Sequence, residues 1–388
     1  MNPLNPLFAV IVMTIACITG YIINLKAKTK KSNSRFETID GLRGFLALAV
    51  FIHHSTIWHQ FIHEGTWRLP DSNLYIHFGE TSVALFFMIT SFLFVTKLIN
   101  TKEHDFNWNH FFISRFFRIV PMYFFSLLLI ILTVMQMSDW ILQVDLLVFL
   151  KSIMYWLAFT LSDMPYINNY NFTDKINAGV TWSLWYEWLF YFSLPIFSLL
   201  ISYKKPKLFY VIISIVFILF FFVNHILQLY QIYAFAGGAL AAYISKFVSI
   251  NTKLKDYIAS VVVIICLLLI RQFNTSKNDY CIILTSITFT LIASGTSVFG
   301  ILKLSIIKFL GDISYSVYLL HGIILFSVFH FIISFENIKT YTPSQFSMLI
   351  FAITPLVILL SYLGYRFIEK PAMDKSKKII QNLQIKKA

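Results

Sequence analysis

Charged residues are scarce in this chain of 388 residues: only 13% are Asp, Glu, Lys or Arg, against about 25% in a typical soluble domain. Apolar side chains make up 58% of the sequence. This composition excludes an ordinary soluble enzyme and an intrinsically disordered protein. Lys and Arg exceed Asp and Glu by 13, but they punctuate long apolar runs. We therefore interpret them as signals of membrane topology rather than as contacts to nucleic acid.

Cysteine is also rare, and the common catalytic motifs are absent. The three cysteines, Cys17, Cys266 and Cys281, lie in apolar stretches and are odd in number, so we expect no disulfide framework. The sequence has no GxxxxGK(S/T) phosphate loop, no GxSxG nucleophile elbow and no HExxH zinc pair. The ten histidines form no dense run of metal ligands, so no metal is expected.

Long apolar runs, by contrast, are abundant. A membrane-spanning helix needs about 20 mostly apolar residues, and eleven segments of the sequence meet this requirement. We expect spans at about 4–25, 42–62, 77–98, 117–138, 181–203, 208–226, 230–248, 256–271, 281–300, 309–334 and 345–367. The stretch 141–162 is apolar too, but Asp145 and Lys151 interrupt it.

The distribution of positive charge decides whether 141–162 crosses the membrane. If it does not cross, 24 of the 31 Lys and Arg residues fall on one face of the membrane and only six on the opposite face. This is a strong positive-inside bias, and it would disappear if 141–162 crossed. We therefore expect 141–162 to be re-entrant or interfacial, with the N-terminus outside and the C-terminus in the cytoplasm.

Ionisable residues inside a membrane bundle are unfavourable, so each is a candidate for function. Asp40, Gly41, Leu42 and Arg43 are followed by His54, eleven residues after Arg43. In an α-helix this step returns to within about 20° of the same face, about 16 Å further along the axis. His53 points about 80° away from Arg43, so His54 is the better candidate, and Asp40 is expected to pair with Arg43. Alternatively, Arg43 snorkels to the interface and His54 is a satisfied polar residue.

Two arginines lie three residues apart at the start of the span at 117–138. Arg115 and Arg118 therefore project from one side of a helix. Guanidinium groups bind phosphate through paired hydrogen bonds. The arginines either bind a phosphorylated ligand or serve only to anchor the cytoplasmic end of the helix.

Two later spans also contain polar residues. Trp182 and Glu187 lie near the expected outer end of the span at 181–203, where they either line a polar path or fasten two helices together. Ser314, Tyr318 and His321 follow at steps of four and three, so they share one side of a helix. That side faces the interior of the bundle, where the residues either contact a substrate or form hydrogen bonds between helices.

These motifs, in this order, resemble those of the acyltransferase-3 family of integral membrane O-acyltransferases. The resemblance covers about residues 36–370. The stretches that carry it are Asp40–Arg43 with His54, Phe86–Leu93, Arg115 and Arg118 with Pro121, Trp182–Tyr191, and Ser314–His321. The chain departs from the family pattern at Thr90-Ser91, where Ser-Gly is usual, and at Ala84, where an aspartate is common. A mechanism that needs a carboxylate at position 84 is therefore in doubt.

The resemblance implies an all-α polytopic membrane protein: a ten-helix bundle plus one extra N-terminal helix. The expected parts are 1–35 (the extra helix and a basic linker), 36–372 (the membrane acyltransferase domain) and 373–388 (a basic cytoplasmic tail). The implied reaction moves an acyl group, acetyl by preference, from cytoplasmic acetyl-CoA to a hydroxyl of a cell-envelope glycan such as lipopolysaccharide O-antigen or capsule. The implied location is the bacterial inner membrane. The expected partners are the glycan or its lipid-linked form and membrane lipids, but not nucleic acid.

The resemblance also implies roles for the polar residues. The catalytic candidates are His54, Arg43 and Asp40, with His54 accepting the proton of the acceptor hydroxyl. The candidates for binding acetyl-CoA are Arg115, Arg118 and Arg43. Those for lining the acceptor path are Glu187, Trp182, Ser314, Tyr318 and His321. The alternative is a transporter or flippase of a glycan or lipid-linked precursor, which would use the same buried charges. Such proteins commonly contain internal repeats, and this sequence shows none.

Overall fold

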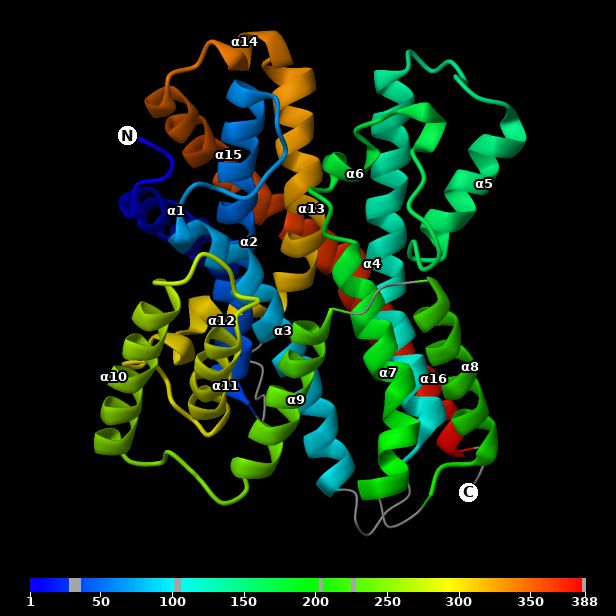
Figure 1. Cartoon of the computed structure of the whole chain (residues 1–388), viewed down its shortest axis with the longest axis vertical. Helices are drawn as coiled ribbons and strands as arrows, with labels where there is room; N and C mark the ends of the chain where they lie inside the picture. The colour runs from blue at the N-terminus through cyan, green and yellow to red at the C-terminus, as the bar shows by residue number, and fades with distance from the viewer. Residues whose placement is uncertain (28–35, 101–105, 202–204, 225–227, 386–388) are drawn as a thin grey trace. The chain divides into compact units, whose positions relative to one another are not determined.

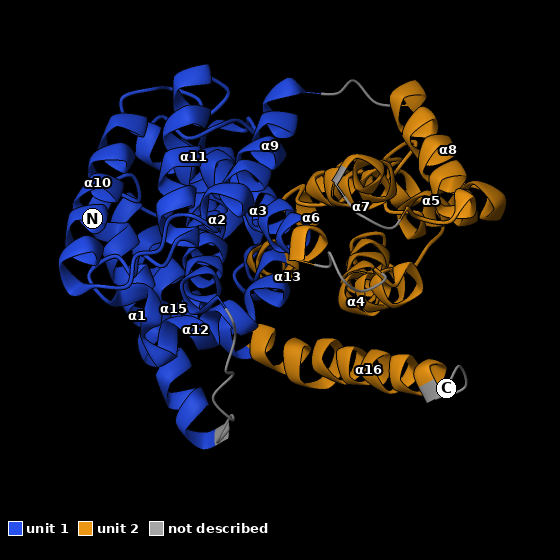
Figure 2. Cartoon of the chain, turned by 90° about the horizontal axis from the view of Figure 1, so that it is seen from below, with its two compact units in different colours: residues 1–96, 228–318, 328–359 blue, residues 97–227, 319–327, 360–388 orange. Residues whose placement is uncertain are grey.

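The computed structural model describes residues 1–27, 36–100, 106–201, 205–224 and 228–385, and every regular element in these ranges is helical. The predicted all-α class is therefore confirmed. The basic linker expected at 28–35 lies outside the described residues. The chain forms two compact units, coloured separately in Figure 2.

The first unit comprises residues 1–96, 228–318 and 328–359. It contains most or all of α1 (Pro6–Ala27), α2 (Glu37–Glu64), α3 (Asn73–Asn100), α9 (Leu229–Ile244), α10 (Lys253–Ile270), α11 (Asp279–Ala293), α12 (Ser305–Asp312), α14 (Phe335–Lys339) and α15 (Pro343–Gly364). Helix α2 is its centre, because α1, α11, α12 and α14 all contact it.

The second unit comprises residues 97–227, 319–327 and 360–388. It contains α4 (Trp108–Met137), α5 (Leu146–Leu157), α6 (Thr173–Ile176), α7 (Trp182–Ile201), α8 (Leu208–Asn224) and α16 (Lys370–Ile385). The long helix α4 contacts α5, α6 and α16, and α7 packs on α8 (Figure 1). Helix α13 (Ser314–Ser327) contributes residues to both units.

Within the described residues, a helix lies in each of the eleven predicted spans, but several helices are shorter than predicted: α11 ends at Ala293, whereas its span was expected to reach 300. Within the expected span at 309–334, α12 ends at Asp312 and α13 begins at Ser314, because Ile313 leaves the helical conformation. Six described helices are long and apolar enough to cross a membrane. They are Pro6–Lys26, Glu37–Glu64, Asn73–Asn100, Trp108–Met137, Ser314–Ile332 and Pro343–Gln384.

The stretch 141–162 does not form a full span. Its helix α5 has 12 residues and is about 18 Å long, whereas the hydrocarbon core of a bilayer is about 30 Å thick. Helix α5 itself packs against a longer helix: the Tyr123 hydroxyl, midway along α4, donates to the Trp156 carbonyl of α5 (2.6 Å). The backbone of Asn177 and Ala178 lies directly against Gly322 of α13. These contacts fit the re-entrant alternative of the prediction.

Two glycines allow α2 and α12 to touch through their backbones. A Cβ atom on Gly41 would lie 2.1 Å from the Leu302 carbonyl oxygen, and one on Gly311 would lie 1.9 Å from that of Asp40. No other residue type fits such an approach. The crossing therefore fixes the segment from Asp40 to Arg43 against the segment that leads into α13.

Candidate functional site

Helix α2 presents His54 as an accessible residue in an otherwise buried stretch. Residues 46–53 and 55–58 are buried, whereas His54 is partly exposed. The helix is uninterrupted from Glu37 to Glu64, so Arg43 and His54 lie on the same side, about 16 Å apart along the axis. Arg43 is also partly exposed. Both predicted residues therefore retain some exposed surface.

The neighbouring His53 cannot play the same part. Its side chain is 5% exposed, and its Nδ1 lies 2.6 Å from the Tyr75 carbonyl oxygen. Since a carbonyl only accepts hydrogen bonds, Nδ1 carries the proton and donates it. The ring also lies against Gly79 of α3, where an added Cβ would approach it to 2.5 Å. This supports the preference for His54 that helical spacing suggested.

At the start of α2, Glu37 forms an ion pair with Lys308 of α12 (3.0 Å). The Asp40 carbonyl lies against Gly311 where α2 crosses α12. The pairing expected between Asp40 and Arg43 stays a prediction.

The predicted polar stripe of α13 is buried. Ser314, Tyr318 and His321 are 1%, 8% and 0% exposed. The Tyr318 ring meets Phe86 of α3 edge to face, with centroids 6.1 Å apart. His321 immediately precedes Gly322, which contacts the re-entrant segment at Asn177. These positions agree with the expectation that this side of α13 faces the interior of the bundle.

In the second unit, the structure brings together two residues that the sequence analysis had separated. The Tyr191 hydroxyl donates a hydrogen bond to Glu187 Oε1, and the Arg115 guanidinium also interacts with this hydroxyl. Glu187 had been placed near the outer end of its span, and Arg115 at the cytoplasmic end of another. Tyr191, 1% exposed, links them. Its spacing of four residues from Glu187 was the available signal. Trp182 lies apart from this cluster, with its ring edge to face on Tyr186 at 6.1 Å.

Arg118 already has a negative partner. It forms an ion pair with Glu369, whose side chain is fully buried, and its Nη1 lies 3.0 Å from the Met373 sulfur. Glu369 was not predicted as a partner because the last span was expected to end at about residue 367. The helix instead continues, so the carboxylate reaches α4. A phosphate would have to compete with Glu369 for Arg118, which favours the anchoring alternative for Arg118 and leaves Arg115 as the stronger phosphate candidate.

No carboxylate stands at the position where the family commonly has an aspartate. Ala84 is buried, at 2% exposure. Glu80, one turn earlier on α3, accepts hydrogen bonds from the Thr275 hydroxyl (3.0 Å) and the Ser276 backbone N–H (2.7 Å). It thereby holds the loop before α11. The residues that the structure describes also include no group of three or more His, Cys, Asp or Glu that could hold a metal ion.

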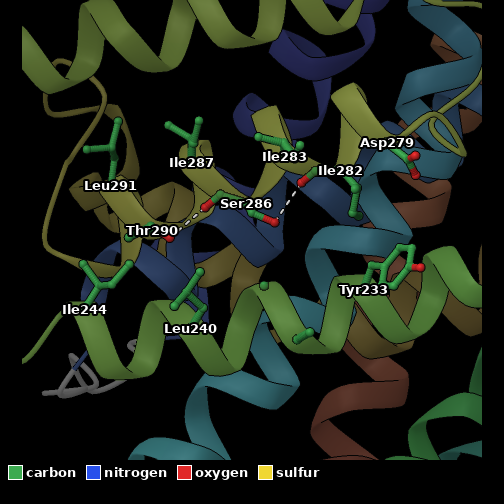
Figure 3. A pocket seen from close by; sticks show the side chains of 12 residues that line it. Tyr233, Leu240, Ile244, Asp279, Ile282, Ile283, Ser286, Ile287, Thr290 and Leu291 are labelled. Carbon is green, nitrogen blue, oxygen red and sulfur yellow. Dashed lines mark hydrogen bonds between the residues drawn. The ribbon is translucent and has the colours of Figure 1, made fainter.

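A groove of about 780 Å³ lies between α9 and α11 in the first unit. Figure 3 shows its walls of leucine and isoleucine, with Tyr233 and Asp279 near one end. Two of its hydroxyls bond within α11: Ser286 donates to the Ile282 carbonyl and Thr290 to the Ser286 carbonyl, both at 2.7 Å. The groove contains none of the predicted site residues.

The long apolar helices and the polar residues held among them define a polytopic integral membrane protein. Residues 36–366 match the model of a family described as an acyltransferase domain, Acyl_transf_3. The chain belongs to this family and is a membrane acyltransferase. No curated protein and no solved structure matches it.

Proposed function

We propose that the protein is an O-acyltransferase that moves an acetyl group from cytoplasmic acetyl-CoA to a hydroxyl of a cell-envelope glycan, such as lipopolysaccharide O-antigen or capsule. The observation that carries this proposal is the partly exposed His54 in the buried middle of α2, on the same side as Arg43. A partly exposed imidazole among buried side chains is suited to general base catalysis.

In the proposed reaction, the acceptor hydroxyl oxygen attacks the thioester carbonyl of acetyl-CoA while neutral His54 takes the hydroxyl proton. The carbon–sulfur bond breaks, the coenzyme A thiolate leaves, and the proton on His54 then passes to the thiolate or to solvent. Arg43 carries positive charge along the same side of α2 and is assigned to the donor's thioester end or phosphates. Arg115 is assigned to the donor phosphates, whereas Arg118 is held by Glu369.

The positive-inside bias supports a bacterial inner-membrane location with the N-terminus outside and the C-terminus in the cytoplasm. In this orientation α4 begins on the cytoplasmic side, so Arg115 lies at the end of the helix where acetyl-CoA arrives. The acceptor is assigned to the opposite side, where the re-entrant segment, Trp182 and the polar side of α13 are candidates to guide it. Glu187, which meets Arg115 through Tyr191, is assigned to the place where the acceptor approaches the donor.

Cells provide the first test. The acetyl content of envelope glycans is measured by mass spectrometry in cells that lack the protein and in cells that carry the wild type, His54→Ala or His63→Ala. His63 is the matched control, because it also lies on α2 but near its exposed end. We expect acetylation with the wild type and His63→Ala, and a loss of about 100-fold or more with His54→Ala.

The amount of each variant in the membrane is measured in parallel. Acetylation that survives His54→Ala would contradict the role of His54. A glycan that changes place but not acetyl content when the protein is removed would favour the transporter alternative.

A further inference from the structure

The extra N-terminal helix α1 packs on Tyr75, which lies next to the histidine that precedes His54. The Tyr75 hydroxyl donates a hydrogen bond to the Asn5 carbonyl oxygen (2.8 Å), just before α1 begins. Phe8 of α1 is completely buried, and its ring centroid lies 6.5 Å from that of Tyr75. Tyr75 itself is completely buried. The start of α1 therefore fixes the first turn of α3 where Tyr75 lies.

Tyr75 in turn holds His53. Its carbonyl oxygen accepts the proton on His53 Nδ1 at 2.6 Å. The imidazole rests against Gly79, one turn further along α3, which leaves no room for a side chain. One hydrogen bond and one steric wall thus determine how the His53 ring is oriented.

His53 then forms one wall beside His54. The two ring centroids are 5.0 Å apart, and the ring planes meet at 72°, edge to face. Consecutive helical residues diverge by about 100° around the axis, so the rings touch only while their side chains lean together. A ring that cannot turn restricts its neighbour, and general base catalysis depends on such restriction.

We infer that His53 is a positioning residue for His54, and that Tyr75 and the N-terminal helix hold His53 in that position. This inference rests on the proposed function. The order of contacts runs from Asn5 to Tyr75, from Tyr75 to His53, and from His53 to His54. The extra helix is accordingly a support for the reacting imidazole.

The test compares His53→Leu with His53→Asn in the full-length protein. Asparagine retains an N–H close to the position of Nδ1, whereas leucine cannot donate to Tyr75. We expect His53→Leu to lower kcat about tenfold, to change the KM for acetyl-CoA less than about twofold, and to shift the acid limb of the pH profile. His53→Asn is expected to recover most of kcat.

A second readout does not depend on activity. Diethyl pyrocarbonate modifies accessible neutral imidazoles, and its rate at His54 is followed by mass spectrometry. His53→Leu removes the imidazole that lies beside His54, and it is expected to raise this modification rate about threefold or more. Tyr75→Phe loses only the hydrogen bond to Asn5, so a smaller rise is expected. The matched control is His77→Leu: His77 is also buried and binds a carbonyl, that of Phe273 at 2.8 Å.

The outcomes separate the two proposals. If His53→Leu and Tyr75→Phe leave both kcat and the modification rate of His54 at the wild-type values, the positioning role is wrong. If His77→Leu reproduces the effects of His53→Leu, they reflect general loosening, and the positioning role is equally wrong. If the wild type transfers no acyl group but the modification rate responds as expected, the proposed function fails while the support of His54 by His53 stands.

Discussion

At the scale of single residues, the second unit pairs its buried charges more completely than the sequence suggested. Glu369 has no exposed surface and contacts Arg118, and Glu187 accepts the Tyr191 hydroxyl that Arg115 also contacts. A buried charge without a partner is strongly unfavourable. Arg118 and Glu369 are thus interdependent, and either one alone would destabilise the unit.

Replacing Glu369 by glutamine is expected to reduce the stability of the folded protein by about 3 kcal/mol, because it leaves the Arg118 charge unmatched. The midpoint of thermal unfolding in detergent measures this effect. The control is Glu336→Gln, which removes an ion pair with Lys339. The Glu336 side chain is 82% exposed, so its loss should change the free energy of unfolding by about 0.5 kcal/mol or less. Equal midpoints for the two variants would show that the pair with Arg118 is not stabilising.

At the scale of helices, the crossing of α2 and α12 determines where the predicted site residues lie. Gly41 and Gly311 let the two backbones meet. This crossing therefore anchors the segment of α2 that ends in Arg43. In membrane proteins, small residues at such crossings permit close van der Waals packing between helices. The conformation of the predicted motif is therefore a property of the pair of helices rather than of α2 alone.

Gly311→Ala is expected to destabilise the protein by about 2 kcal/mol, since its Cβ would overlap the Asp40 carbonyl and force the helices apart. Gly20→Ala on α1 provides the comparison. Its Cβ would meet only the ends of flexible side chains, at 3.0 Å and beyond. The fraction of monodisperse protein after size-exclusion chromatography should fall for Gly311→Ala and stay near the wild-type value for Gly20→Ala. A similar yield for both would refute the tight crossing.

Hydropathy and charge predicted most of the helices because lipid leaves the backbone few alternatives. Charge bias correctly denied 141–162 a full span. The helical period predicts that Arg43 and His54 share one side, and the helix is unbroken between them. Partners across helices were not predictable in this way. The link from Arg115 to Glu187 depends on which helices are neighbours, and Glu369 was missed because the last helix runs on from Pro343 to Gln384.

At the scale of the whole molecule, family membership and the apolar helices establish a membrane acyltransferase. The orientation remains a proposal that rests on the excess of Lys and Arg on one face. The orientation matters for function because acetyl-CoA is available only on the cytoplasmic side. A reversed protein would present Arg115 and α16 to the wrong compartment.

The orientation can be tested with single cysteines placed in a background without Cys17, Cys266 and Cys281. Lys339→Cys, at the end of α14, is expected to react with an impermeant maleimide in intact spheroplasts. Lys377→Cys, on the exposed side of α16, should react only after permeabilisation. The reverse pattern would overturn the proposed orientation and, with it, the assignment of Arg115 to the donor phosphates.

The most direct measurement of the central claim is the release of coenzyme A thiol from acetyl-CoA by the purified full-length protein in detergent, supplied with an acceptor glycan. We predict that the wild type releases one thiol for each acetyl group added to the glycan. His54→Ala, if it folds as the wild type does, is predicted to release thiol at a rate lower by about 100-fold or more. Thiol release by His54→Ala at the wild-type rate would contradict the role of His54. If the wild type releases no thiol when it is given the glycan that is found acetylated in cells, the proposed reaction is contradicted.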